Sequence, residues 1–234
     1  MSTSQVVTAL AAEGAALCAA LAGLTAADLD RASPCPPWTA GELTCHVIVG
    51  ARRIGPAMRE PDDPAAALIA TIGYYRPDKR FSAAIDADRI DTARKLARRL
   101  GGPDAIRAEL TRACVAAVAL LTPAPADRTV RTRHGDRMLL TDFARTRVVE
   151  LALHGLDLAI ALDRPPWLTS EAAIVLEELL LPAGDAALLC AELGIDRAGL
   201  IALLTGRAVP APAETALLAT AGAVHLALSA GASY

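Results

Sequence analysis

The sequence predicts an all-α fold, in which a four-helix bundle is followed by a helical C-terminal extension and interrupted by one short β-hairpin. Composition is the first reason. Hydrophobic residues make up 53% of the 234 residues and aromatic residues only 3%, so the core has to be built mainly from Ala, Leu, Val and Ile. Ala and Leu are strong helix formers. The second reason is that apolar residues recur at helical spacing in several separated segments.

The first two predicted helices lie on either side of a proline-rich break. The first covers residues 4–24 and has apolar residues along one side. The second begins after Thr39, because Thr39 and Glu42 have the spacing of a capping box, in which the hydroxyl and the carboxylate each bind a free amide at the helix start. This helix carries His46 and is expected to continue to about residue 58.

The rest of the chain alternates helices with breaks rich in Pro, Gly and Asp. Residues 61–79 form a long connection, and loops of this length are often functional. The further predicted elements are helices over residues 82–100 and 105–121, a hairpin over residues 128–140, a helix over residues 141–162 capped by Thr141, and about three helices after residue 167.

These elements predict two parts. The core of the bundle is expected to consist of the helices that start near residues 4, 39, 104 and 141. The predicted division assigns residues 1–164 to the bundle and residues 165–234 to an extension that packs on it. We expect a monomer or a homodimer.

Charge and sequence patterning exclude several classes of protein. The net charge of −3 provides no field that would attract nucleic acid. The N-terminus lacks the basic start and apolar segment of a secretory signal, so we expect a cytoplasmic protein. The most apolar stretch, residues 216–232, is interrupted by polar residues and Gly and is interpreted as a core helix rather than a membrane span. The five cysteines include no Cys-x-x-Cys pair, which favours reduced thiols over disulfides.

The predicted helix over residues 141–162 is apolar on nearly every side, yet it carries a polar stripe. The stripe consists of Arg147, Glu150, His154 and Asp157, which fall within roughly 80° of the helix circumference. Charges on a buried helix are costly unless they are paired or bind a metal. The stripe is therefore the feature that most needs a functional explanation.

Glu150 and His154 are four residues apart and project from one face, close enough to bind a single ion. An imidazole and a carboxylate suit zinc and other divalent transition metals, and a third protein ligand would leave one position open for water or substrate. His46 is the best candidate for that ligand. Alternatives remain: the pair is an ordinary intrahelical contact, or His46 is a hydrogen-bonded core residue. Asp157 either pairs with Arg147 or accepts a hydrogen bond from a ligand histidine.

Two motifs of the sequence contain the candidate ligands. The first is Ser33-Pro-Cys-Pro-Pro-Trp38-Thr-Ala-Gly-Glu-Leu43-Thr-Cys-His46. The second runs from Gly135-Asp-Arg-Met-Leu-Leu-Thr-Asp-Phe143 to Arg147-Val-Val-Glu150-Leu-Ala-Leu-His154-Gly-Leu-Asp157. Both resemble motifs of a known family, the N-terminal domain of mycothiol-dependent maleylpyruvate isomerases in the DinB-like superfamily of metal-binding four-helix bundles. The resemblance implies a DinB-like bundle whose metal ligands are His46, Glu150 and His154.

The resemblance also implies a function. A divalent metal, zinc in our interpretation, would bind the thiol of mycothiol and supply a thiolate to a small electrophile. If the thiolate adds reversibly to a double bond and then leaves, the protein is an isomerase. If the thiol stays attached to the product, the protein is an S-transferase. The C-terminal part resembles the helical tails of relatives, including the segment Leu203-Leu-Thr-Gly-Arg207, rather than the mixed α/β domain of the isomerase. The substrate therefore stays open.

A carboxylate-bearing substrate would need cations near the metal. Arg147 is assigned a catalytic role because it lies on the polar stripe, and Arg133 and Arg137 are candidate substrate-binding residues on the hairpin. A solvated basic loop is the alternative for these two. The alternative for the whole chain is a non-catalytic bundle that binds a metal or small ligand in a sensor, resistance or accessory role.

Overall fold

The computed structural model describes residues 1–76, 78, 82–224 and 226, and it confirms the predicted all-α fold with one small antiparallel sheet. Helices and strands follow one another as α1 (Thr3–Ala20), α2 (Ala26–Leu29), α3 (Ala40–Arg52), α4 (Ile54–Arg59), the 3-10 helix η1 (Thr71–Tyr75), α5 (Ala83–Leu100), α6 (Pro103–Leu121), β1 (Thr129–Arg131), β2 (Arg137–Leu139), α7 (Leu140–Ala161), α8 (Ser170–Leu180), α9 (Ala186–Leu193), α10 (Arg197–Leu204) and α11 (Pro212–Thr220).

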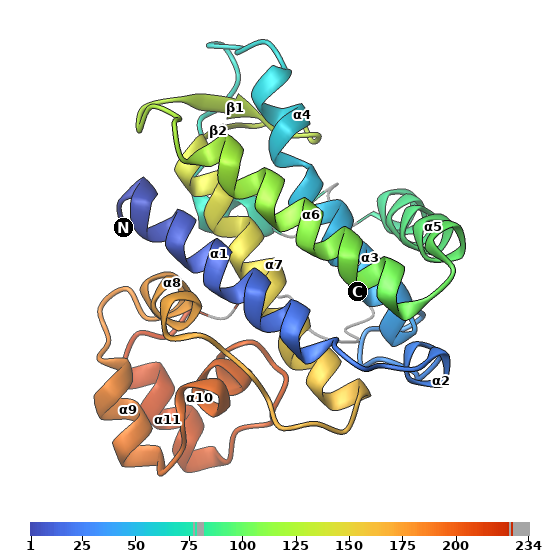
Figure 1. Cartoon of the computed structure of the whole chain (residues 1–234). Helices are drawn as coiled ribbons and strands as arrows, with labels where there is room; N and C mark the ends of the chain where they lie inside the picture. Colours follow the sequence, from blue (N-terminus) through green and yellow to red (C-terminus); the bar gives the residue numbers. More distant parts are fainter. Residues whose placement is uncertain (77, 79–81, 225, 227–234) are drawn as a thin grey trace.

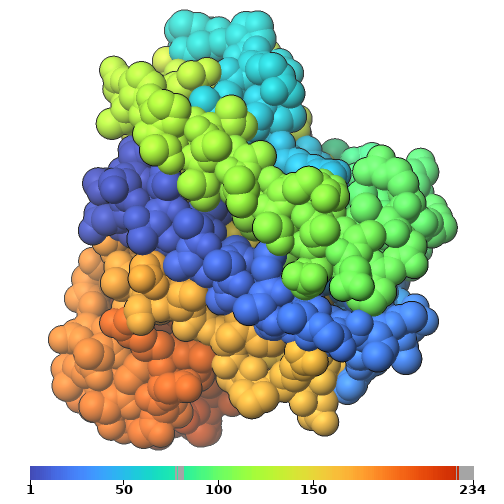
Figure 2. Space-filling model, in the orientation of Figure 1, coloured from blue at the N-terminus to red at the C-terminus, as the bar shows by residue number. Residues whose placement is uncertain are grey.

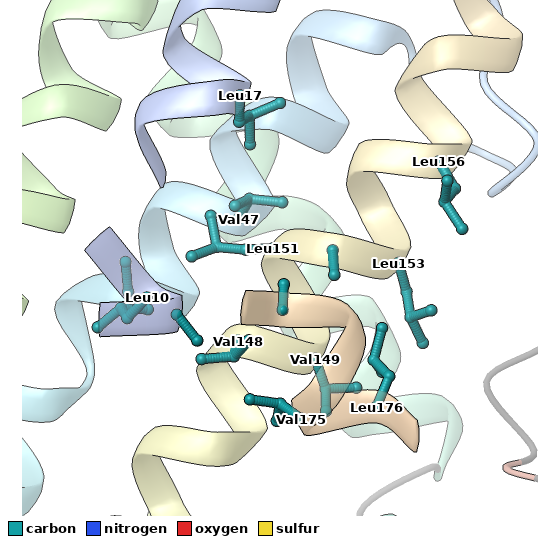
Figure 3. Packing of buried hydrophobic residues seen from close by; sticks show 14 of the residues in the cluster. Leu10, Leu17, Val47, Val148, Val149, Leu151, Leu153, Leu156, Val175 and Leu176 are labelled. Atoms are coloured by element: carbon teal, nitrogen blue, oxygen red, sulfur yellow. The ribbon is translucent and has the colours of Figure 1, made fainter. Parts of the chain in front are cut away.

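Four long helices form the bundle, as predicted. Helices α1 and α3 each pack against both α6 and α7, and α5 covers the outer side of α3 (Figure 1). Helix α7 lies at the centre, and Figure 3 shows side chains of α1, α3, α7 and α8 meeting there, among them Leu10, Val47, Leu151 and Val175. A Leu buried in such a core stabilises the fold by about 2–5 kcal/mol relative to Ala.

Local signals at the helix ends were read correctly at one position and wrongly at two. The capping box of Thr39 and Glu42 is present. The predicted continuous helix to residue 58 is wrong, because Pro56 has no amide hydrogen to donate and the chain starts a new helix, α4, with Pro56 in its first turn. The predicted cap at Thr141 is also wrong. Helix α7 begins at Leu140, directly after β2, and the Thr141 hydroxyl hydrogen-bonds to that of Thr3 at 2.7 Å.

The predicted hairpin is present, and it ties the long connection to the bundle. Val130 of β1 pairs with Met138 of β2, and the turn contains Gly135 in the left-handed region at φ 89°. The Ile69 amide donates to the Arg137 carbonyl at 2.9 Å. The connection therefore runs along β2 and brings η1 against α7.

The C-terminal part comprises four short helices in the described residues, where about three were predicted. The additional break lies at Gly194, whose φ of 66° ends α9. Helix α8 packs on α1 and α7, and Figure 2 shows α8 to α11 as one lobe beside α1. The domain division at residue 164 stays a prediction.

The apolar stretch 216–232 lies partly outside the described residues, because residues 225 and 227–234 are not among them. Within the described part, α11 ends at Thr220. Among all the residues that the structure describes, no helix is both long and apolar enough to cross a membrane.

A buried carboxyl group fastens the C-terminal lobe to the bundle. Glu13 of α1 is 0% exposed, and one of its oxygens accepts hydrogen bonds from Thr169, the N-cap of α8, from the amide at 2.9 Å and the hydroxyl at 2.6 Å. Its other oxygen has no hydrogen-bond partner among the described residues. Burial raises the pKa of Glu13, and the contacts with Thr169 offset only part of that effect.

We predict that the free energy of unfolding of Glu13→Gln increases relative to that of the parent protein as pH rises. A raised pKa means that the folded state holds the proton more tightly, so the contribution of Glu13 is present at low pH and is lost as pH rises through the folded pKa. The amide keeps the acceptor for Thr169 without titrating. Each unit of pKa shift corresponds to about 1.4 kcal/mol. Urea unfolding from pH 4.5 to 8 measures the difference, with exposed Glu192→Gln as control. Parallel pH profiles of the parent and Glu13→Gln would contradict the prediction.

Candidate metal site

The structure brings His46 of α3 together with Glu150 and His154 of α7. The Nε2 atoms of His46 and His154 lie 3.4 and 3.5 Å from the same oxygen, Oε2 of Glu150. One ligand atom from each of the three residues lies within 4.8 Å of the others. The three side chains are between 14% and 19% exposed, so the cluster is largely covered but reachable.

The separations within this triad suit a metal ion. Ligands placed about 2.0–2.1 Å from a tetrahedral zinc ion are about 3.3–3.4 Å from one another. The two nitrogen–oxygen distances agree with that spacing and are longer than the 2.7–3.2 Å of a good hydrogen bond. Two imidazoles and one carboxylate form a donor set that zinc accepts, with a fourth position left over. The residues present therefore fit a divalent metal.

The surroundings of the three candidate ligands shift their pKa values. Burial lowers the pKa of His46 to about 4, so this imidazole is neutral at pH 7 and has a lone pair for a metal. Burial opposes the ionisation of Glu150, but the facing imidazoles and the charge of Arg147 outweigh it and hold its pKa well below the usual range. Burial also opposes the protonation of His154, but the groups around it, beginning with Asp157, hold its pKa well above the usual range.

Trp38 fixes the orientation of His46. The two rings are stacked, with centroids 4.5 Å apart and an interplanar angle of 24°. Trp38 lies just before the capping box of α3, and His46 lies within that helix. The first sequence motif therefore contains both of the stacked residues. Its indole Nε1 is buried and has no hydrogen-bond partner in the described structure. A donor without a partner beside the triad suits a site that receives a polar ligand.

Asp157 orients His154 from the side away from the triad. Its Oδ2 lies 2.9 Å from Nδ1 of His154, which leaves Nε2 facing Glu150. Of the alternatives for Asp157, the geometry agrees with an acceptor for a ligand histidine. Such carboxylate–histidine contacts fix the ring and raise its basicity as a ligand.

Asp157 has a buried partner that the sequence did not predict. Arg207, which follows α10, donates from Nε to Oδ1 at 2.9 Å and from Nη2 to Oδ2 at 2.8 Å. The side chains are 2% and 0% exposed. The segment Leu203-Leu-Thr-Gly-Arg207 was noted for its resemblance, but nothing in the spacing links Arg207 to a residue 50 positions earlier.

A second group of possible ligands is less suitable. Cys35, His154 and Asp157 also have ligand atoms within 4.8 Å of one another. However, the Cys35 thiol already donates to Oδ2 of Asp157 at 3.2 Å, and Arg207 neutralises the same carboxylate. A metal bound there would have to displace a buried bidentate ion pair, which costs several kcal/mol. The triad is the better candidate.

Arg147 is held inside the bundle beside the triad. It is 4% exposed, its Nε donates to the Thr146 hydroxyl at 3.0 Å, and its guanidinium carbon lies 5.4 and 5.0 Å from the ring centroids of Tyr74 and Phe143. Its charge helps to keep Glu150 ionised. The catalytic role assigned to Arg147 stays a prediction.

The two hairpin arginines have different surroundings. Arg137 forms a bidentate ion pair with Asp62, with both distances 2.8 Å, and the structure does not bring it to the other candidates. Arg133 lies at the surface, where its side chain is 23% exposed and its Nη1 lies 3.8 Å from Asp88. Of the two arginines, Arg133 lines a pocket and Arg137 does not. The same pocket is lined by Tyr74 and Phe143, the aromatic neighbours of Arg147. Their substrate-binding roles stay predictions.

Comparison with known proteins gives a consistent picture. The family model described as mycothiol maleylpyruvate isomerase N-terminal domain matches residues 10–159. The fold is similar to a crystal structure of the mycothiol-dependent maleylpyruvate isomerase, with a TM-score of 0.51 and 14% identity over 84% of this chain and 74% of that one. A histidine-to-alanine variant of that enzyme gives a TM-score of 0.51 and 13% identity over 77% and 70%. Curated protein sequences gave no significant match.

We predict that Asp157→Asn weakens zinc binding by about 10–100-fold, because the amide loses the charge that orients His154. Competition with a chromophoric zinc chelator measures the affinity. Asp163→Asn is the matched control, since Asp163 is exposed just beyond the same helix. Circular dichroism establishes that both variants fold. Equal zinc affinities in the two variants would show that Asp157 does not support the ligand.

Proposed function

Because the chain belongs to the mycothiol maleylpyruvate isomerase N-terminal domain family, we propose that it is a metal- and thiol-dependent enzyme, an isomerase or an S-transferase. Its divalent ion, most suitably zinc, is held by His46, Glu150 and His154. Its thiol cofactor is mycothiol, and its substrate is a small electrophile. The observation that carries the proposal is the pair of 3.4 and 3.5 Å separations within the triad, which match the spacing of tetrahedral zinc ligands.

When bound, the metal supplies Lewis acidity, which lowers the pKa of a coordinated thiol so that the nucleophilic thiolate forms at neutral pH. The residues of the chain provide the setting. His46 and His154 present neutral nitrogen donors once the proton of His154 is released, and Asp157 holds the second ring in place. Arg147 favours the ionised form of Glu150. The buried Cys45 does not supply the thiol, since it lies beside His46 in sequence on a different helix face, and the Cys35 thiol already donates to Asp157.

The two parts of the chain have different roles in this proposal. Residues 1–164 supply the metal ligands. Residues 165–234 supply Arg207, whose guanidinium group donates two hydrogen bonds to the carboxylate of Asp157. The extension therefore supports the site from the side opposite the triad. A carboxylate on the substrate would be attracted by the positive charge of Arg147.

We predict that the purified protein contains about one equivalent of zinc and that His154→Ala loses both the metal and the binding of mycothiol, because the other two ligands cannot retain the ion alone. Elemental analysis and calorimetry on the same samples measure the two properties. His134→Ala, which removes an imidazole from the hairpin turn, is the control and should keep the metal.

Two results would contradict the proposal. A folded parent protein that takes up no divalent metal would show that the triad is structural. A metal-loaded protein that ignores the thiol and turns over no electrophile would favour the alternative, a non-catalytic bundle that binds a metal or a small ligand as a sensor, resistance or accessory protein.

A further inference from the structure

A pocket at the hairpin end of the bundle is separate from the metal triad. Its volume is about 310 Å³, at the lower end of the range for small-molecule sites. None of the three triad residues lines it. It lies between α4, η1, the hairpin and the start of α7, and its lining includes Arg53, Glu60, Tyr74, Arg131, Arg133 and Phe143.

The pocket has an excess of positive charge. Among the residues that the structure describes, three guanidinium groups line it, against the carboxylate of Glu60. Within the described part of the chain, neither Arg53 nor Arg131 has a carboxylate within 4 Å, whereas Arg133 has Asp88 at 3.8 Å. Burial, followed by repulsion from Arg133 and Arg147, lowers the pKa of Arg53 to about 10. The group is still charged at pH 7, so a bound anion would relieve this repulsion.

Arg147 and its aromatic neighbours form the wall between the two sites. The guanidinium of Arg147 packs on the rings of Tyr74 and Phe143, which line the pocket, and Glu150 lies one helical turn further along α7. Phe143 and Glu150 are seven residues apart, which is about 10 Å along a helix. A small ligand in the pocket therefore does not reach the triad.

The lining also indicates the kind of anion. Besides the guanidinium groups, the walls carry the rings of Tyr74 and Phe143 and the apolar surfaces of Pro56 and Ala57. Guanidinium groups bind carboxylates through paired hydrogen bonds, and the rings suit an apolar body. Pro56 and Glu60 are exposed, so the rim is open to solvent.

We propose that this pocket is a second small-molecule site, distinct from the metal centre, which binds an organic carboxylate through the guanidinium groups of Arg53, Arg131 and Arg133. The site does not depend on the metal- and thiol-dependent function proposed above. It gives Arg133 a ligand-binding role and gives none to Arg137, which is already paired with Asp62.

Calorimetric titration of the full chain with benzoate tests the proposal, before and after treatment with a metal chelator. We expect one saturable site in both samples, with affinity that falls at least about tenfold in Arg53→Met/Arg131→Met, because the variant loses the charge-assisted hydrogen bonds of two guanidinium groups. Arg59→Met removes the same charge from an exposed position of α4 and should bind benzoate like the parent. Should the double variant not fold, Arg131→Met alone is measured.

Four results would overturn the proposal. They are the absence of saturable benzoate binding, its loss after chelation, an affinity unchanged by the arginine substitutions, and equally tight binding of inorganic phosphate. Loss after chelation would place the ligand at the metal triad, and tight phosphate binding would indicate a site for anions in general. Because the titration is repeated on metal-free protein, its failure is distinguishable from failure of the proposed metal chemistry.

Discussion

The compensation of charge on the central helix governs much of this structure. Helix α7 is buried on nearly all sides, yet Arg147, Glu150, His154 and Asp157 lie along it. An isolated charge in such surroundings costs several kcal/mol, so each of these side chains needs a partner from elsewhere. Those partners come from α3, from η1 and from the C-terminal lobe. The helices around α7 therefore supply its polar partners, namely the imidazole of His46, the ring of Tyr74 and the guanidinium of Arg207.

This requirement connects the two parts of the chain. Asp157 orients His154, and Arg207 neutralises Asp157. In a second contact, Glu13 reaches the N-cap of α8 from within the bundle. The C-terminal helices thus contribute polar contacts at two separated points in addition to apolar burial. Removing one partner of a buried ion pair typically costs 3–5 kcal/mol, so the lobe and the triad are energetically linked.

The metal triad and the pocket at the hairpin end favour ions of opposite charge. At the triad, two imidazoles and a carboxylate favour a cation, whereas at the hairpin end the arginines favour an anion. Arg147 lies between the two, inside the protein, and its charge faces Glu150 on one side and aromatic rings on the other. Arg147 and Glu150 lie three residues apart on α7, and the attraction between their opposite charges favours the ionised form of both.

The sequence by itself determined what depends on local spacing. The helical periods, the capping box at Thr39, the hairpin around Gly135 and the convergence of Glu150 and His154 all follow from residues within a few positions of one another. The choice of His46 rests on its place in a separate predicted core helix and on the motif that resembles the family's. Only the tertiary structure revealed Arg207 beside Asp157, and only it showed that Arg137 pairs with Asp62. These depend on how distant segments pack, and packing is decided by the whole core rather than by any short stretch of sequence.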